Sequence, residues 1–538
     1  MVEEQLATTT DSRGMSASGR PASLSLGLTV AELQLGALRR RPDATALVCE
    51  GRRYTYRQME ERVSQVAQLF ASKGLGRGDG VAVLAANRAE VIFANWAAQS
   101  LGMRYTPLHP KGSETDHRYI LAHAEISALV VDGEAFGARG KALQTGAQLK
   151  QVFVLAGDFG VDLTAEADRF QPKPVQVQAR AEDICNVLFT GGTTGRPKGA
   201  AHRHVSVNSA TVQSLAFWDW PSEVRFLITT PISHAAGGML TPTLLKGGEF
   251  HVLPSFDVTS FLETIERERI TATFVVPSMI YDLLDKAPLN SYDLSSLEMI
   301  IYGASPISPA RLREAIERIG QKFCQLYGQT EAPNVVTYLS REDHDLSRPH
   351  LLESCGLGLP PNQIKLIKED GSEAAVCEAG EICVRGPLVM DSYWNSPEET
   401  AKAFKDGWLR TGDVARRDDR GFLYVVDRLK DMVISGGFNV FTREVEDCLA
   451  QHSSVASAAV IGVPHPRWGE AVAAFVVLRP GATATAEELI ALVHRKKGAV
   501  QAPKSLEFVE ALPLTAMGKV DKKVLRAPFW GAEGRAVG

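Results

Sequence analysis

The sequence has little cysteine and no pattern that would use it in pairs. Seven cysteines are scattered through 538 residues, and no CxxC pair occurs. The odd number and the irregular spacing argue against a disulfide framework. The sequence therefore favours a reducing, cytoplasmic location over an oxidising compartment.

Long apolar runs and one-sided charge are also missing. No stretch of 18 apolar residues occurs, so we expect no membrane-spanning helix, and the segment up to Pro21 lacks the apolar core of a signal peptide. The formal net charge is −5 without a block of five like charges, which gives no indication of nucleic acid as a partner. Hydrophobic residues make up 45% of the chain, as in globular proteins with substantial cores.

Short β-rich apolar runs alternate with stretches of helical spacing through most of the chain. Apolar runs at 80–87 and 271–278 are typical of buried strands, whereas 57–74, 258–270 and 309–323 have the spacing of amphipathic helices. Strands that alternate with helices predict parallel α/β sheets. We therefore expect an α/β fold with layered sheets.

Two changes in this pattern predict the domain organisation. From about 356 the sequence contains short strands with turn signals and no helices between them, which indicates a small β-subdomain. After 431 the pattern becomes that of a compact α+β unit. The predicted division is a disordered tail at 1–23, a large N-terminal domain at 24–429 with its β-subdomain at about 356–429, a hinge at 430–431, a C-terminal domain at 432–528 and a tail at 529–538.

The segment FTGGTTGRPKG, at 189–199, follows an apolar run and combines four glycines with three threonines and one lysine. Glycines let backbone N–H groups converge on an anion, and Lys198 adds a positive charge, so a polyphosphate is the natural ligand. The spacing differs from the Walker A loop. On composition alone, a flexible surface loop fits the segment equally well. The glycines at 73–80 end a helical stretch and are interpreted as a helix C-cap.

The segment TGGTTGRPKG resembles the signature of the adenylate-forming superfamily, which includes acyl- and aryl-CoA synthetases. Four further segments resemble its other motifs in the same order: YGQTE at 327–331, GWLRTGD at 407–413, DRLKDMVISGGFNV at 427–440 and PLTAMGKVDKK at 513–523. The resemblance spans about residues 25 to 526. It implies that a carboxylate attacks the α-phosphate of ATP, and that the thiol of coenzyme A then displaces AMP.

The resemblance also implies roles for individual residues in the first half-reaction. Lys519 would reach the α-phosphate from the C-terminal domain, Thr330, Glu331 and His234 would complete the catalytic group, and Glu331 with Thr194 would hold Mg²⁺. The expected ATP- and AMP-binding residues are Thr190, Gly191, Gly192, Thr193, Thr194, Lys198, Gly303, Ala304, Ser305, Gln325, Tyr327, Gly328, Gln329, Thr330, Asp413, Val425 and Arg428. Alternative explanations are turn chemistry for Asp413, core packing for Tyr327 and a solvated surface for Lys519.

The second half-reaction requires the C-terminal domain to move, because a lysine in the site blocks the thiol. The resemblance places the hinge at Lys430 and coenzyme A contacts at Gly436, Gly437 and Trp468. Simple packing explains Trp468 equally well. Some branches of the superfamily carry lysines at the positions of Ile434 and Gly436, and this chain has none there.

The segment PISHAAGGM, at 231–239, is the expected wall of the acid pocket. No acidic residue occurs from Leu227 to Lys246, so a substrate ammonium group would lack a partner. Small residues after His234 favour a bulky or long apolar acid, such as a fatty, steroid-like or terpenoid-like acid. The expected pocket residues are His234, Ala235, Ala236, Gly237, Ser278, Met279, Gly303, Leu326 and Pro333, with Pro277 and Gln329 nearby.

Alternatives stay open at this point. An aryl- or cinnamoyl-CoA ligase and an acyl-AMP ligase that loads a separate carrier protein use the same motifs. A non-enzymatic ATP-binding protein is less favoured, because Lys198, Glu331, Asp413 and Lys519 are all present. The expected partners are ATP, Mg²⁺, coenzyme A and a small carboxylic acid, with a homodimer as one possibility.

Overall fold

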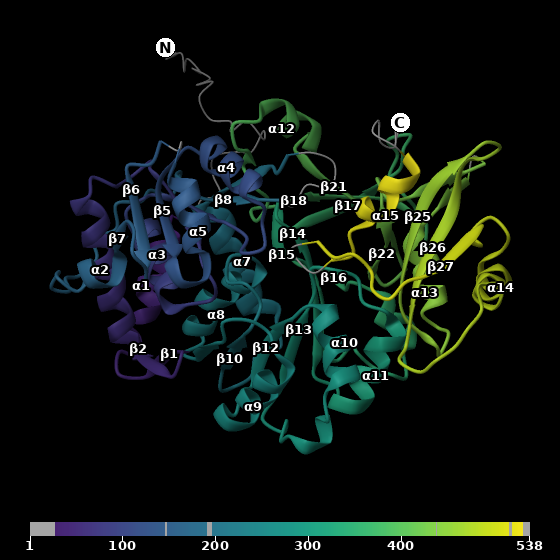
Figure 1. The fold of residues 1–538 in the computed structure, drawn as a ribbon, viewed down its shortest axis with the longest axis horizontal. Coiled ribbons are helices and arrows are strands. Elements are labelled where there is room, and N and C mark those ends of the chain that lie inside the picture. The colour runs from purple at the N-terminus through teal and green to yellow at the C-terminus, as the bar shows by residue number, and fades with distance from the viewer. Residues whose placement is uncertain (1–26, 146–147, 191–195, 437, 516–518, 531–538) are drawn as a thin grey trace, which may run out of the picture.

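The computed structural model describes residues 27–145, 148–190, 196–436, 438–515 and 519–530. The expected tail at 1–23 lies outside these residues. Among the described residues, the strands form four sheets, and no helix is both long and apolar enough to cross a membrane. Figure 1 shows the first sheet in blue on the left, the second in teal at the centre and the C-terminal sheet in yellow-green on the right.

The first sheet contains the glycine-rich segment. Its central strands are parallel, and its edge strands β9 and β19 are antiparallel. The strand order is β19 (Ser392–Tyr393), β9 (Gly199–Arg203), β8 (Ile184–Phe189), β4 (Arg104–Pro107), β3 (Gly80–Leu84), β5 (Ile126–Asp132), β6 (Gln151–Leu155) and β7 (Val161–Asp162).

The second sheet lies beside the first and is also parallel at its centre. The strand order is β16 (Leu357–Gly358), β15 (Ala332–Leu339), β14 (Phe323–Gln329), β13 (Met299–Tyr302), β12 (Ala272–Val275), β10 (Arg225–Ile228), β11 (Glu249–Val252), β1 (Thr45–Cys49) and β2 (Arg52–Thr55).

Helices connect and cover these strands. They are α1 (Val30–Leu38), α2 (Tyr56–Ser72), α3 (Ala89–Ser100), α4 (Glu114–His123), α5 (Gly133–Gln144), α6 (Leu163–Ala167), α7 (His204–Phe217), α8 (Leu240–Leu245), α9 (Val258–Glu268), α10 (Pro277–Lys286) and α11 (Pro309–Ile319), with a 3-10 turn at Ala235–Met239. Helix α3 is apolar around most of its circumference and is buried, as expected for a helix within a core. The largest core cluster joins residues of both sheets with this helix.

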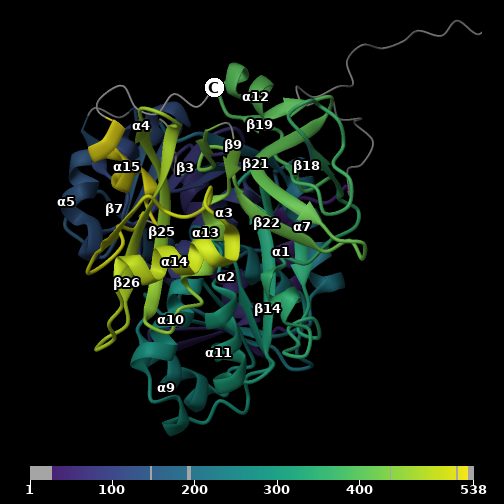
Figure 2. The same cartoon turned by 90° about the vertical axis from the view of Figure 1, so that its right-hand side faces the viewer.

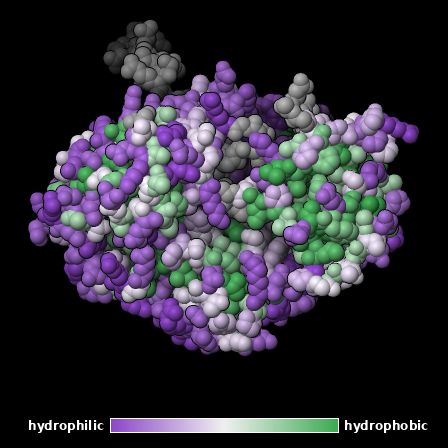
Figure 3. Space-filling view, in the orientation of Figure 1, coloured by the Kyte–Doolittle hydropathy of each residue, from purple (hydrophilic) through white to green (hydrophobic). Residues whose placement is uncertain are grey.

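The β-subdomain and the C-terminal region follow. The subdomain contains β17 (Gln363–Ile367), β18 (Gly380–Arg385), β20 (Phe404–Lys405), β21 (Trp408–Arg417) and β22 (Leu423–Arg428). The C-terminal sheet contains β23 (Val433–Ser435), β24 (Phe438–Val440), β25 (Val455–His465), β26 (Gly469–Leu478) and β27 (Ser505–Phe508), with α13 (Thr442–Leu449), α14 (Ala486–Lys497) and α15 (Lys522–Trp530). Figure 2 shows this region from its own side, and Figure 3 shows hydrophobic side chains gathered on part of its surface.

The predicted α/β class is confirmed, and the structure differs from the sequence interpretation in two details. Helix α12 (Pro397–Ala403) interrupts the stretch at 356–429 in which we expected no helix. The helix has only seven residues, with too few apolar positions to show a helical period. Helix α15 continues to Trp530, whose indole N–H donates to the carbonyl of Gly462 at 2.9 Å, so the chain is ordered beyond residue 529. Residues 531–538 of the expected tail lie outside the described residues.

Candidate active site

The candidate site lies beyond the carboxyl ends of the parallel strands in both large sheets. In open α/β sheets, ligands bind at this edge. Strand β8 leads to the glycine-rich segment and β10 leads to His234, whereas β13 leads to Gly303 and β14 leads to Thr330. Segments that are far apart in the sequence therefore meet at one edge of the fold.

The strands on either side of the glycine-rich segment, β8 and β9, pair with each other antiparallel. The backbone N–H of Thr190 donates to the carbonyl of Lys198 at 2.9 Å and closes the base of the loop. The glycine-rich segment is followed by the strand β9, whereas a helix follows a Walker loop. Gly191, Gly192, Thr193 and Thr194 lie outside the described residues.

Lys198 is engaged by α12, an element that the sequence interpretation did not include in the site. Its ammonium group forms an ion pair with Glu399, and Nζ lies 5.3 Å from the ring centroid of Tyr393. Side-chain bonds from Lys198 and then Lys402 lower the pKa of Glu399 to about 2. Lys198 therefore has an acidic partner on α12.

Glu331 is a buried carboxylate at the turn after β14. Its Oε1 accepts a hydrogen bond from the hydroxyl of Tyr393 at 2.6 Å. The carbonyl of the preceding Thr330 accepts from Nε2 of His202 at 2.8 Å. Tyr393 thus contacts both Glu331 and Lys198, the two residues expected to handle the metal and the phosphates.

Asp413 is buried at the turn within β21 and has two partners. The hydroxyl of Tyr327 donates to Oδ2 at 2.7 Å, and Nε of Arg428 lies 3.1 Å from Oδ1. Burial, followed by the Asp413 charge, holds the pKa of Tyr327 well above its ordinary value, so the phenol keeps the proton that it donates. The amide of Gln329 donates to the carbonyl of Thr411 at 3.3 Å. Tyr327 and Arg428, two predicted nucleotide residues, therefore both contact a third, Asp413.

The turn after β13 carries Gly303, Ala304 and Ser305. A Cβ on Gly303 would lie 2.5 Å from the carbonyl oxygen of Leu326, so only glycine fits between these strands. Ala304 has φ +66°, which is uncommon for a residue with a side chain and is typical of functional turns.

Three further predicted nucleotide residues lie in strands close to this turn. Gln325 is buried, and its amide oxygen accepts from the hydroxyl of Tyr302 at 3.1 Å. Gly328 is packed against the backbone of Asn334, and Val425 is partly buried in β22.

Lys519 reaches the site from the C-terminal region. Thr515 and Lys519 close a tight loop, because the N–H of Thr515 donates to the carbonyl of Lys519 at 2.7 Å. Burial lowers the pKa of Lys519 to about 8, the charge of Arg428 contributes in the same direction, and Asp413 opposes it. Glu331 also acts on this ammonium group, and the charge of Lys519 acts on His234. Lys519 therefore lies among the residues that the other motifs supply.

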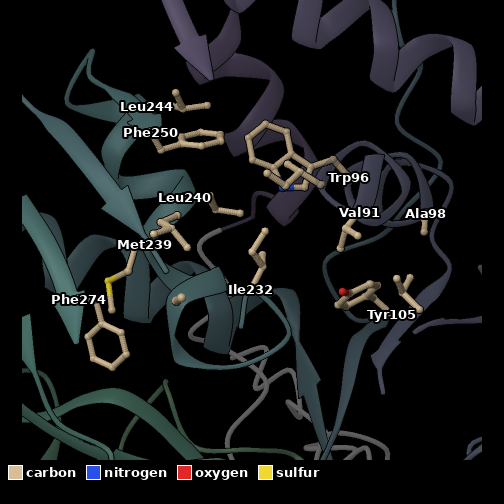
Figure 4. Packing of buried hydrophobic residues seen from close by; sticks show 14 of the residues in the cluster. Val91, Trp96, Ala98, Tyr105, Ile232, Met239, Leu240, Leu244, Phe250 and Phe274 are labelled. Carbon is tan, nitrogen blue, oxygen red and sulfur yellow. The ribbon is translucent and has the colours of Figure 1, made fainter. Parts of the chain in front are cut away.

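His234 lies on the loop between β10 and the turn at Ala235–Met239. Figure 4 shows that Ile232, Met239 and Leu240, on both sides of this loop, point into the core and anchor it. The hydroxyl of Ser233 lies 2.8 Å from Nδ1 of His234. Burial lowers the pKa of His234 to about 3, with smaller effects from His109 and Lys519, so the imidazole is neutral at physiological pH.

The other expected pocket residues surround this loop at differing depths. Ala236 is buried, the carbonyl of Ala235 accepts from the amide of Asn334 at 3.3 Å, and a Cβ on Gly237 would lie 2.3 Å from the carbonyl of Ile232. Met279 packs against the second core cluster. Ser278 and Pro333 are partly buried, and Leu326 is buried.

The predicted hinge and coenzyme A residues lie in the C-terminal half. Lys430 is located between β22 and β23, and burial followed by the charge of Arg428 lowers its pKa. Gly436 has φ +60°, and its N–H donates to the carbonyl of Trp468 at 2.9 Å. The Trp468 ring stacks on His465 with centroids 4.1 Å apart, and Lys504 lies 5.5 Å from it. Gly437 lies outside the described residues.

Among the residues that contact predicted site residues, sequence reasoning missed His109, His202, Tyr393, Glu399 and Lys504. Tyr393 and Glu399 belong to SYWNSPEET, whose aromatic and acidic residues flank a helix start, and this was the available signal. The other three are single residues in ordinary surroundings. Their importance depends on contacts over a long distance in the sequence.

Comparisons with known proteins agree with this geometry. Residues 36–394 match the family described as AMP-binding enzyme, and residues 444–519 match the AMP-binding enzyme C-terminal domain. A medium/long-chain-fatty-acid–CoA ligase of Mycobacterium tuberculosis is 47% identical over 522 residues, which cover 94% of this chain and 91% of the relative. A feruloyl-CoA synthase of Amycolatopsis sp is 36% identical over 497 residues, which cover 91% of this chain and 97% of that protein.

Solved structures give the same result. The amide bond synthetase McbA from Marinactinospora thermotolerans has a TM-score of 0.85 and 35% identity, and the match covers 91% of this chain and 99% of that chain. The family match at 36–394 alone covers more than half of the 538 residues. The chain therefore belongs to the family of AMP-binding, adenylate-forming enzymes, in its acyl-CoA synthetase branch.

Proposed function

We propose that this acyl-CoA synthetase activates a bulky or long apolar carboxylic acid, and that Lys519 serves the first half-reaction only. In that step, a carboxylate oxygen attacks the α-phosphorus of ATP, and pyrophosphate leaves with the electrons of the broken P–O bond. In the second step, the thiol of coenzyme A loses its proton and attacks the acyl carbon, and AMP leaves. One observation carries the proposal: Lys519 lies close enough to interact electrostatically with Glu331, Asp413 and His234.

Each group has a role in the first step. Lys198 and the glycine-rich segment would hold the phosphates that leave, and Asp413 with Arg428 would accept the ribose hydroxyls. Tyr327 would then release Asp413 and offer its ring to the adenine, since aromatic faces stack well on bases. Lys519 would neutralise the charge that develops on the α-phosphate, a contribution that is large where water is excluded.

Glu331 is the residue that fits Mg²⁺ among those expected to hold it. Magnesium is usually held by one or two carboxylates together with substrate phosphates, and it would neutralise phosphate charge in the transition state. Among the described residues, no group of three or more His, Cys, Asp or Glu side chains could hold a metal by itself. A single buried carboxylate is consistent with an ion that arrives with ATP.

The nature of the acid follows from the surroundings of His234. The wall from Leu227 to Lys246 has no acidic residue, and His234 is neutral, so a substrate ammonium group would have no counter-charge. Similarity to a fatty-acid–CoA ligase and to a feruloyl-CoA synthase supports fatty acids first and cinnamate-type acids second.

The remaining parts of the proposal concern organisation. We place the pivot of domain movement at Lys430–Asp431 and the thiol path beside Gly436 and Trp468. A cytoplasmic location is consistent with seven free thiols. Formation of a homodimer and transfer of the acyl group to a carrier protein both stay predictions.

A panel of carboxylic acids tests the proposal. Purified protein with ATP and magnesium is supplied with fatty, cinnamate-type, benzoate-type and amino acids, with and without coenzyme A, and pyrophosphate and thioester are measured. We expect fatty acids to give pyrophosphate without coenzyme A and thioester with it, and amino acids to give neither. Activity restricted to amino acids, or no acyl-adenylate from any acid, would contradict the proposal.

A further inference from the structure

His109 and His234 come from different sheets and meet at the candidate site. His109 lies on the loop between β4 in the first sheet and α4, whereas His234 follows β10 in the second sheet. Their ring centroids are 4.7 Å apart with planes at 74°, an edge-to-face contact. Such pairs prefer this geometry and hold each other in one orientation. The contact joins the two sheets directly beside the expected acid pocket.

The loop around His109 is built to hold this ring in place. The backbone N–H of Lys111 donates to Nδ1 of His109 at 3.1 Å, so in the neutral ring the proton is on Nε2. His117 Nε2 donates to the carbonyl of His109 at 3.0 Å, and Arg139 in turn lies 3.3 Å from Nδ1 of His117. A Cβ on Gly112 would lie 2.5 Å from the His117 ring, which requires glycine there. Both the tautomer and the backbone of His109 are therefore fixed.

His234 has fewer constraints of its own. Its Nδ1 lies beside the hydroxyl of Ser233, its neighbour in the chain, and the ring of His109 is the aromatic contact of its imidazole. The Lys519 charge acts on His234 from the C-terminal region. Contact with the His109 ring thus limits rotation of the His234 ring, and Nε2 of His234 is the nitrogen that Ser233 does not contact.

We propose that His109 is a positioning residue for the acid substrate, acting through His234. This inference rests on the proposed function: the acid carboxylate must lie between His234 and Lys519 for attack on the α-phosphate. By fixing the plane of the His234 ring, His109 holds that ring in one orientation and directs the carboxylate towards Lys519. It contributes to binding and orientation of the acid, and ATP binding does not depend on it.

A double-mutant cycle with His109→Ala, His234→Ala and the double variant tests this role. Initial rates of pyrophosphate release without coenzyme A give the KM for a fatty acid and for ATP separately. We expect His109→Ala to raise the acid KM about three- to tenfold, in line with loss of an aromatic pair, and to leave the ATP KM within about twofold. In the His234→Ala background the same substitution should have no further effect.

Two additional variants separate positioning from damage to the fold. His109→Phe keeps a ring for the edge contact and should restore most of the acid KM, whereas His350→Ala, at an exposed histidine in the second half of the chain, should change neither constant. Equal increases in both KM values, or full additivity in the double variant, would overturn the inference.

Imidazole NMR of the ligand-free protein gives a readout that does not depend on catalysis. The His234 signal is assigned with His234→Gln, and we expect His109→Ala to shift it, whereas His350→Ala should leave it unchanged. If His109→Ala left the His234 signal unshifted, the inference would be overturned, whether or not any acid is turned over. Failure of the acid panel with a shifted signal would instead contradict the proposed function alone.

Discussion

At the scale of single residues, the ion pair between Lys198 and Glu399 is the contact that ATP would have to break in the proposed function. Glu399 is about one-third exposed, at 32% of its side chain, and an exposed pair contributes at most about 1 kcal/mol. Glu399 would thus compete only weakly with the phosphates of ATP for Lys198. Its low pKa keeps it charged under all working conditions.

We therefore predict that Glu399→Gln tightens ATP binding up to about fivefold, because Lys198 no longer has to leave a carboxylate. Equilibrium binding of ATP to the acid-free protein measures the effect. Glu398→Gln is the matched control, since it removes the same charge from an exposed neighbouring position on α12. Weaker ATP binding in Glu399→Gln would show that Glu399 orients Lys198 and does not compete for it.

Sequence analysis identified some of the site residues and missed others, for a physical reason. Lys198, Glu331, Asp413 and Lys519 lie in segments whose composition and order are recognisable without a fold. Glu399 and Tyr393, which contact Lys198 and Glu331, were not found, and neither was His109, which contacts His234. Each of them meets its contact only after distant segments of the chain have been assembled. The roles of the motif residues stay predictions, although the structure brings Lys519, Asp413, Glu331 and His234 together.

At the scale of elements, helix α13 is connected to β22 by the side chain of Asp427. The buried carboxylate of Asp427 accepts from the backbone N–H of Thr442, the first residue of α13, and from its hydroxyl at 3.2 Å. This bond satisfies one of the N–H groups that every helix start leaves without a partner. Lys522 of α15 donates to the Thr442 hydroxyl at 2.7 Å and lies 2.7 Å from Glu446.

The same carboxylate predicts a pH dependence of stability. Burial raises the pKa of Asp427 from 3.8 to about 6, with Lys522 opposing the shift. A carboxyl group with a raised folded-state pKa contributes stability below its ordinary pKa, and this contribution is lost as the pH rises through about 6. We expect the wild type to gain melting temperature relative to Asp427→Asn as the pH falls from 7.5 to about 4.5.

Differential scanning calorimetry at several pH values provides the measurement. Asp419→Asn, which neutralises an exposed carboxylate close in sequence, should follow the wild type at every pH. A constant difference between wild type and Asp427→Asn across this range would show that Asp427 does not titrate there.

At the scale of elements, sequence patterns predicted the long helices but missed one short helix and the direction of some strands. The amphipathic helices expected at 57–74, 258–270 and 309–323 are present as α2, α9 and α11, because a long period-3.6 pattern is a strong signal. Helix α12 was missed because seven residues are too few to show a helical period, although its proline and two glutamates are typical of a helix start. The antiparallel edges at β9 and β15 were missed because strand direction depends on partners that are distant in the sequence.

At the scale of the whole molecule, the site is completed by a residue from the C-terminal region. Asp413 and Arg428 lie on the β-subdomain, His234 and Glu331 lie on the second sheet, and Lys519 arrives from beyond β27. Arg526 of α15 forms an ion pair with Asp431, next to the proposed pivot. In the proposed function, the arrangement that places Lys519 in the site would serve adenylate formation, and the thiol step would use another arrangement of the same two parts.

The measurement that tests this account most directly separates the two half-reactions in Lys519→Ala. Adenylation is followed as pyrophosphate release without coenzyme A, and thioester formation is followed from a supplied acyl-adenylate. We predict a loss of about 10²- to 10³-fold in adenylation with thioester formation largely unchanged. Lys523→Ala, at an exposed lysine of α15, should change neither rate. Equal loss of both half-reactions in Lys519→Ala would contradict the account.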